Sequence, residues 1–329
     1  MKFTSTTSVS LCLLAIEAKP ASPESNSQIF KSMPDLRISG GPGADIADFP
    51  FAVSIRAYTK DKKVTSQCTG VLLSDRVVLT AATCFDNSNL NGAEITDIYV
   101  SAGSNLSIES TKKEHMLASS RINAPGFKID QGAIYENIAL IFLEKKIEDT
   151  GVKYAKMYPH EIDAGIKLKV AGWGFKKNQS PDTYSKVLLQ APVKTSILDV
   201  CKKYNTLWKD NSKCQICTVT KNNQSACIGD QGGPLVYDAG ENKVLVGILS
   251  FYGADENRIA CAENGMPTYY TNVYHHINWI SEVTGISKDE LVADVEKASP
   301  SDKISPGISI LISLAITFFT FLLSIGIFA

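Results

Sequence analysis

Between residues 38 and 286 the chain breaks into a long series of short apolar or alternating segments. Each segment is bounded by Gly, Asn, Asp or Pro, as in "TGVLLS", "KLKVAGWG" and "KVLVGILSF". Short strands separated by turn residues are typical of all-β sandwiches and barrels. The segment "TNVYHHINWISEVTGI" differs, because Val273, Ile277 and Ile280 recur at helical spacing. We therefore expect an all-β domain that is closed by a C-terminal helix.

Composition and charge narrow the classes of function. Hydrophobic residues make up 44% of the 329 residues and charged residues 20%, so the chain can bury a substantial core and lacks the marks of disorder. The 33 Lys and Arg residues nearly balance the 34 Asp and Glu residues. Because no basic excess is present, we expect no nucleic-acid partner.

The first residues are typical of an exported protein. Residues 1–18 combine Lys2, an apolar run over residues 9–16 and the small residue Ala18, which together predict a secretory signal peptide. The alternative is an ordinary N-terminal strand or helix. Residues 19–37 are polar, carry prolines and show no apolar face, which indicates a propeptide or leader.

The last residues predict attachment to a membrane. Residues 307–329 are hydrophobic, and from Ile308 onward no residue is charged. As a helix, this uncharged segment would span about 33 Å, which is enough to cross a bilayer. No basic residue follows, and a polar stalk, residues 287–306, precedes this tail, so we expect a GPI-attachment signal. A retained transmembrane helix and a buried core helix are the alternatives. The expected location is the extracellular face of the plasma membrane, or the extracellular space.

Cysteines and sequons agree with export. Of the 8 cysteines, Cys12 lies in the signal, so an odd number remains and one has no intramolecular partner. The short "CQIC" permits a redox or metal-binding interpretation, but a disulfide plus the spare thiol of Cys214 is simpler, and we expect neither metal nor cofactor. Sequons predict glycosylation in exposed loops at Asn105, Asn178 and Asn223.

Several motifs occur in a fixed order along residues 38–286. They are "ISGG" after Arg37, "LTAATC" (79–84), "NIALIFL" (137–143), "AGWG" (171–174) and "ACIGDQGGP" (226–234). Together they resemble the trypsin/chymotrypsin-like serine proteases. The resemblance implies two six-stranded antiparallel β-barrels with a cleft between them and a C-terminal helix.

The catalytic triad of that family is absent from the matching positions. Thr83 stands in place of the histidine, Asn137 in place of the aspartate and Gln231 in place of the serine. Acyl transfer needs a nucleophile, an imidazole and an orienting carboxylate. Near pH 7 the side chains of Thr83, Asn137 and Gln231 cannot perform these functions. The histidines lie outside the motifs: His115, His160, His275 and His276. The resemblance therefore implies an inactive homologue.

The replacements suggest a neutral site. A buried aspartate without its imidazole would be an uncompensated charge, which Asn137 avoids. We expect Thr83, Asn137 and Gln231 to form a neutral hydrogen-bonded cluster.

Other family positions keep parts of the scaffold. Gly229 resembles the oxyanion-hole glycine. Asp230 resembles the aspartate that pairs with the new N-terminus of Ile38 after cleavage at Arg37, although it could instead cap local backbone amides.

The resemblance also assigns a specificity pocket and disulfides. It places Ser225 at the base of the specificity pocket and Tyr252 and Thr268 on its walls, so the pocket has no carboxylate and is narrowed. The implied disulfides are Cys68–Cys84, Cys201–Cys217 and Cys227–Cys261.

The functional expectation is binding without proteolysis. A surface-anchored homologue of this kind would bind an extracellular protein or peptide, such as an active protease or an inhibitor, through the loops around its cleft. The alternatives are an active serine-type endopeptidase with a rearranged site and an adhesive or structural surface protein.

Overall fold

The computed structural model describes residues 42–300, except for residues 87–93, 131–132, 176–183, 198, 241, 256–257, 260 and 262. The predicted signal peptide, leader, Arg37, Ile38, Asn178 and hydrophobic tail therefore lie outside the described residues. Among the residues described, no helix is long and apolar enough to cross a bilayer.

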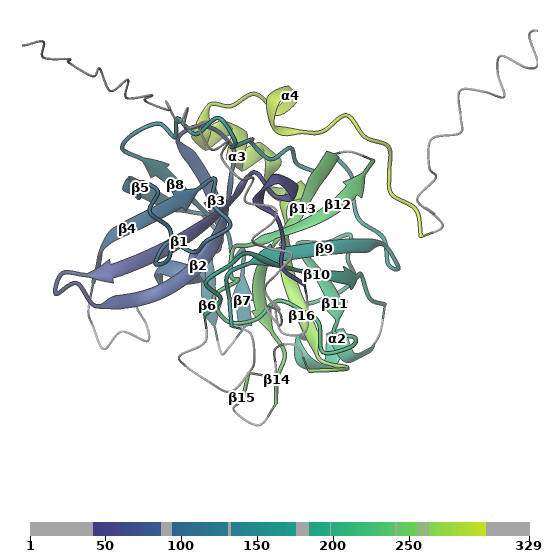
Figure 1. Cartoon of the computed structure of the whole chain (residues 1–329). Coiled ribbons are helices and arrows are strands. Elements are labelled where there is room, and N and C mark those ends of the chain that lie inside the picture. Colours follow the sequence, from purple (N-terminus) through teal and green to yellow (C-terminus); the bar gives the residue numbers. More distant parts are fainter. Residues whose placement is uncertain are drawn as a thin grey trace, which may run out of the picture. The chain divides into compact units, whose positions relative to one another are not determined.

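The first half of the domain is a closed antiparallel barrel (Figure 1). Its strands follow the order β1-β2-β3-β8-β5-β4. Their bounds are β1 (Ala52–Thr59), β2 (Val64–Leu72), β3 (Val77–Thr80), β4 (Ile95–Ala102), β5 (Met116–Asn123) and β8 (Ala139–Leu143). A separate hairpin of β6 (Lys128–Asp130) and β7 (Ala133–Tyr135) lies between β5 and β8 in the sequence. A 3-10 turn, η1 (Ile46–Asp48), precedes β1, and a second one, η2 (Ala82–Phe85), follows β3. Apolar side chains such as Ile55, Leu79 and Leu140 are fully buried, so the short apolar runs of the sequence form the barrel core.

The second half is a six-stranded antiparallel sheet in the order β10-β9-β12-β13-β16-β11. Its strands are β9 (Lys167–Gly172), β10 (Leu189–Lys194), β11 (Gln215–Val219), β12 (Pro234–Ala239), β13 (Asn242–Tyr252) and β16 (Pro267–Asn272), with α2 (Asp199–Tyr204) and the small hairpin of β14 (Ala254–Asp255) and β15 (Arg258–Ile259) between them. A bridge between Thr195 and Thr218 links its two edges. The prediction of an all-β fold with two six-stranded antiparallel barrels is confirmed, with the first unit as a closed barrel and the second as a half-barrel.

The C-terminal helix is also confirmed. A 3-10 turn, η3 (Val273–His276), leads into α3 (Ile277–Thr284), and Gly285 ends the helix with a left-handed φ of 73°. Val273, Ile277 and Ile280 are all buried, as their helical spacing predicted.

The folded chain continues past the predicted boundary at residue 286. A capping box joins Ser287 and Glu290 at the start of α4 (Lys288–Leu291), and Leu291 is only 1% exposed. The amide of Met157 donates to the carbonyl of Leu291 at 2.7 Å, and the amide of Ala293 donates back to Met157 at 2.9 Å. The segment predicted as a polar stalk thus begins as a packed part of the domain, because its few apolar residues face the core.

Candidate functional site

The positions that match the family's triad lie where loops from both halves of the domain meet. Thr83 lies in η2 just after β3, and Asn137 lies just before β8. Strands β3 and β8 are paired with Thr80 opposite Ala139, so these two positions are held together. The loop before β12 carries Gln231, and the Thr69 amide of β2 donates to the Gln231 carbonyl at 2.9 Å.

Thr83 and Asn137 form a reciprocal hydrogen-bonded pair. The Thr83 amide donates to Asn137 Oδ1 at 2.9 Å, and Asn137 Nδ2 donates to Thr83 Oγ1 at 3.1 Å and to Ser250 Oγ at 2.8 Å. Asn137 is 2% exposed, so a charged residue here would need a partner that the site lacks. The predicted neutral cluster is present for these two residues.

Ser250 belongs to this network, although no sequence motif pointed to it. It lies in β13, two residues before Tyr252, and it is 2% exposed. The resemblance placed Tyr252 at the specificity pocket, and the position of Ser250 two residues earlier, in "ILSFY", was the available signal.

Gln231 was predicted to join this cluster, but its side chain bonds elsewhere. In the described part of the chain, its side-chain oxygen Oε1 accepts a hydrogen bond from the Gly229 amide at 2.7 Å rather than bonding to Thr83 or Asn137. The left-handed φ of Gly229, 95°, shapes the turn in which this bond forms. An amide of an oxyanion hole must be free to meet charge that develops on a substrate. Here the Gly229 amide already has a partner within the chain.

Asp230 is buried and caps backbone amides. It is 1% exposed, and its carboxylate accepts hydrogen bonds from the amides of Gly174 at 2.6 Å and Cys227 at 2.9 Å. Burial raises the pKa of Asp230 to about 7, although both hydrogen bonds act in the opposite direction. A side chain at Gly172 or Gly174 would collide with this carboxylate, which explains the two glycines of "AGWG". Pairing with Ile38 stays a prediction, because Ile38 lies outside the described residues.

The three residues of the predicted specificity pocket are buried and bonded. Ser225 and Thr268 are each 1% exposed, and their hydroxyl oxygens lie 3.0 Å apart. The Tyr252 hydroxyl donates to the Cys227 carbonyl, and burial raises the pKa of Tyr252 well above its usual value, so the phenol is neutral. Ser225 and Thr268 bond to each other and Tyr252 bonds to the backbone, and none of the three offers a charge that would select a basic substrate.

The disulfides form as the resemblance implied, between Cys68 and Cys84, Cys201 and Cys217, and Cys227 and Cys261. Cys214 is not disulfide-bonded. Within the described ranges, no group of three or more His, Cys, Asp or Glu side chains could hold a metal ion.

The histidines are engaged elsewhere. His276 Nε2 lies 3.0 Å from a carboxylate oxygen of Glu136, while ring nitrogens of His160 and His275 contact the carbonyls of Val295 and Ser212 at 2.8 and 2.7 Å. His115 is exposed on the surface. None of these described contacts brings an imidazole to Thr83, Asn137 or Gln231.

One predicted glycosylation site is not exposed. Asn105 is 8% exposed, and its Oδ1 accepts a hydrogen bond from the Ile46 amide. The expectation of an exposed loop is therefore wrong at Asn105, because this side chain anchors the N-terminal segment of the domain. Asn223 is exposed in a turn with a left-handed φ of 53°, as expected. Asn178 lies outside the described residues.

Comparison with known proteins gives a consistent result. The family model described as Trypsin matches residues 38–280. Phenoloxidase-activating factor 3 of Holotrichia diomphalia is 28% identical over 269 residues, which cover 75% of this chain and 72% of that protein. CLIP domain-containing serine protease B4 of Anopheles gambiae is 25% identical over 300 residues, which cover 83% and 77% of the two chains.

Solved structures agree on the fold. Neuropsin from mouse brain superposes with a TM-score of 0.60 and 23% identity, covering 74% of this chain and 98% of that one. A collagenase structure gives the same TM-score of 0.60 at 23% identity, covering 76% of this chain and 100% of that chain.

Proposed function

Since the chain belongs to the trypsin family, we propose that it is an extracellular member of that family that binds a protein or peptide partner without cleaving it. The Thr83–Asn137 pair carries this proposal. Asn137 accepts from the Thr83 amide at 2.9 Å and donates to the Thr83 hydroxyl at 3.1 Å, so the two residues stay in contact through groups that neither take nor return a proton near pH 7.

The loss of rate expected from this site is large. In subtilisin, an unrelated enzyme with the same triad chemistry, removal of the triad lowers turnover by about 10⁶. The residual rate from an oxyanion hole would be reduced further here, because Gln231 already engages the Gly229 amide.

The three disulfides support the proposal that the protein works in an oxidising, extracellular environment.

The proposal of a membrane anchor rests on the apolar sequence of residues 307–329 alone. Phosphatidylinositol-specific phospholipase should release the protein from cells that express the full chain. Retention of the protein, while a control anchored protein is released, would favour a transmembrane helix.

The loss of catalysis is tested by labelling with a fluorophosphonate, which reacts with activated serines. The full chain should show no label above that of a heat-denatured sample, while trypsin in the same tube is labelled. Stoichiometric labelling of any serine in the folded chain would contradict the proposal and favour an endopeptidase with a rearranged site.

A further inference from the structure

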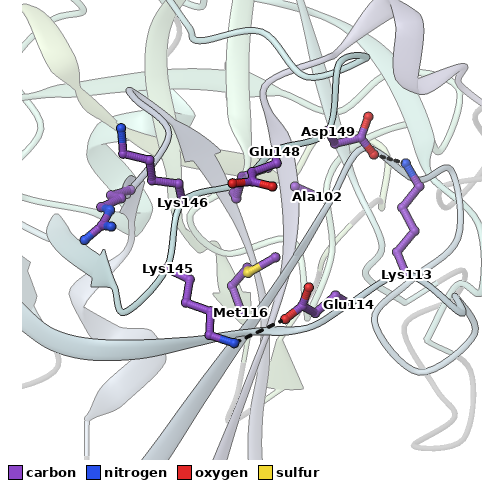
Figure 2. Close-up of a pocket in the computed structure, with 10 residues that line it drawn as sticks. Ala102, Lys113, Glu114, Met116, Lys145, Lys146, Glu148 and Asp149 are labelled. Carbon is purple, nitrogen blue, oxygen red and sulfur yellow. Dashed lines mark hydrogen bonds and ion pairs between the residues drawn. The ribbon is translucent and has the colours of Figure 1, made fainter.

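Two hollows on the domain contain several lysines, and they differ in how those lysines are neutralised. The first, of about 600 Å³, lies on the first barrel (Figure 2). Lys113 forms an ion pair with Asp149, and Lys145 lies 3.9 Å from Glu114. Because nearby carboxylates already neutralise the charge of these lysines, we do not expect this hollow to bind an anion.

The second hollow, which we name the lysine groove, has a volume of about 850 Å³. It is formed by β9, β10 and β12, the end of β11 and the segment after α4, which runs past this half of the domain in Figure 1. Its lysines are Lys167, Lys169, Lys194, Lys221 and Lys297, whereas its carboxylates are Asp238 and Glu296. The groove therefore has an excess of positive charge in a protein whose net charge is −1.

Ion pairs neutralise only part of this excess. Lys169 lies 2.7 Å from a carboxylate oxygen of Asp238, and Lys297 lies 2.9 Å from one of Asp163. Lys167, Lys194 and Lys221 are exposed, and none of them forms an ion pair with another residue of the described ranges. Three ammonium groups thus remain available at the groove.

Two of the available lysines oppose each other directly. In the antiparallel pairing of β9 and β10, Lys167 is the register partner of Lys194, and both side chains point to the outer face. Side chains in such a pair have Cβ atoms about 5 Å apart, and like charges at these positions destabilise a sheet. An anion held between the two ammonium groups would convert this repulsion into attraction.

The groove also presents apolar surface beside the charges. Pro192 lies opposite Lys169 in the strand pairing and is exposed, and the half-buried Val219 and Val295 line the same hollow. A heavily sulfated polysaccharide would meet the lysines but would leave this surface without an apolar partner. A peptide with carboxylates on either side of an apolar residue complements both kinds of surface.

We propose that the lysine groove binds an acidic peptide segment of a partner protein, with carboxylates at Lys167 and Lys194 and an apolar side chain against Pro192 and Val219. Lysines act as point charges, whereas arginines form planar, bidentate contacts, so this groove should select charge density more than a fixed carboxylate geometry. The inference gives a surface and a chemistry to the proposed protein partner, and it does not depend on the loss of catalysis.

Fluorescence anisotropy with labelled eight-residue peptides and the full chain in detergent tests this inference. An alternating Glu–Leu peptide should bind at least tenfold more tightly than a Lys–Leu peptide and more tightly than a Glu–Ser peptide, which lacks the apolar side chains. Its affinity should fall with added salt because the lysines are exposed. Heparin is the competing ligand. Binding of heparin without binding of the Glu–Leu peptide would overturn the proposal in favour of a polysaccharide site.

A pair of charge reversals shows where the peptide binds. Lys194→Glu should weaken binding of the Glu–Leu peptide by about tenfold, which corresponds to about 1.4 kcal/mol. It should also raise the melting temperature by about 1–2 °C, because Lys167 would then face a carboxylate in place of a like charge. The matched control Lys145→Glu, in the first-barrel hollow, should leave the affinity within about twofold. Equal loss of affinity in both variants, or a lower melting temperature for Lys194→Glu, would overturn the proposal.

Discussion

In the cleft at the family's triad positions polar groups are bonded to one another, whereas in the lysine groove several charged groups form no ion pair with another described residue. Asn137 is 2% exposed and bonds to both Thr83 and Ser250, and the Gly229 amide is engaged by Gln231. By contrast, Lys167 and Lys194 face each other across two strands without a described counter-ion. A site that satisfies its own polar groups gains stability but has little left to offer a ligand. We therefore expect the binding site of this molecule to be separate from the cleft that corresponds to the family's active site.

The largest test of this separation is restoration of the triad. The combined change Thr83→His, Asn137→Asp and Gln231→Ser should raise hydrolysis of peptide esters by about 10⁴ over the unmodified chain, after cleavage at Arg37. A triad contributes a factor of about 10⁶ to the rate, and poor positioning of the substrate in the closed specificity pocket should remove a factor of about 10². Binding of the Glu–Leu peptide should not change.

Two results would contradict this prediction. The single change Gln231→Ser supplies a hydroxyl without a base and should remain inert, so activity from it alone would show that another group in the cleft acts as the base. Efficient cleavage of arginine esters by the triple variant would show that Ser225, Thr268 and Tyr252 do not close the pocket.

The buried Asp230 should give the uncleaved chain an unusual dependence on pH. Its pKa is about 7 in the folded protein, against a value of 3.8 for an unperturbed aspartate, so the folded state holds the proton more tightly than the unfolded state. The free energy of unfolding should therefore fall as the pH rises from about 4 to about 7, by about 4 kcal/mol. Denaturant unfolding of the uncleaved chain and of Asp230→Asn measures this, because the variant should lack the slope.

Cleavage at Arg37 extends the same experiment. If the new N-terminus at Ile38 pairs with Asp230, the carboxylate becomes favoured and the slope should disappear. Asp230→Asn should then cost about 3 to 5 kcal/mol in the cleaved chain, because the ammonium is left uncompensated. An unchanged slope after cleavage would contradict the pairing.

Most of the fold was predictable from the sequence because it depends on local patterns. The short apolar runs form strands, and the helical spacing of Val273, Ile277 and Ile280 predicted the position of η3 and α3. The packing of α4 was not predicted, because the sequence around Leu291 is mostly charged and its one buried apolar side chain forms no periodic pattern.

The site was less predictable because its contacts depend on rotamers and on packing between distant segments. The motifs placed Thr83 and Asn137 together, but no pattern specifies that Gln231 turns toward Gly229. The burial of Asn105 depends on a bond to Ile46, far from it in the sequence. The lysine groove is similar, since Lys167 and Lys194 become neighbours only through strand register.

The neutral pair in the cleft should have a measurable effect on stability. Asn137→Ala removes the acceptor of the Thr83 amide and the donor to Ser250, and we expect a loss of about 2 kcal/mol in the free energy of unfolding. The control Thr83→Val removes one hydroxyl at a half-buried position and should cost less than about 1 kcal/mol. If the two variants are equally stable, the cluster does not organise the cleft. Neither variant should alter binding of the Glu–Leu peptide.

The smallest expected effect concerns Gln231 and the Gly229 amide. Gln231→Ala removes the acceptor at 2.7 Å, so hydrogen exchange at the Gly229 amide should accelerate by about fivefold, which corresponds to about 1 kcal/mol for one hydrogen bond. Gln231→Glu is the matched control, because its side chain keeps an oxygen within reach of the same amide and should preserve the slow exchange. Equal exchange rates in Gln231→Ala and the unmodified chain would mean that Gly229 is protected by packing, for example against the nearby Tyr184 ring, and that its amide is not held by the glutamine. The Gly229 amide would then have no hydrogen-bond partner in Gln231, and movement of the packed ring would free it for a ligand, so the contrast between cleft and groove would be incomplete.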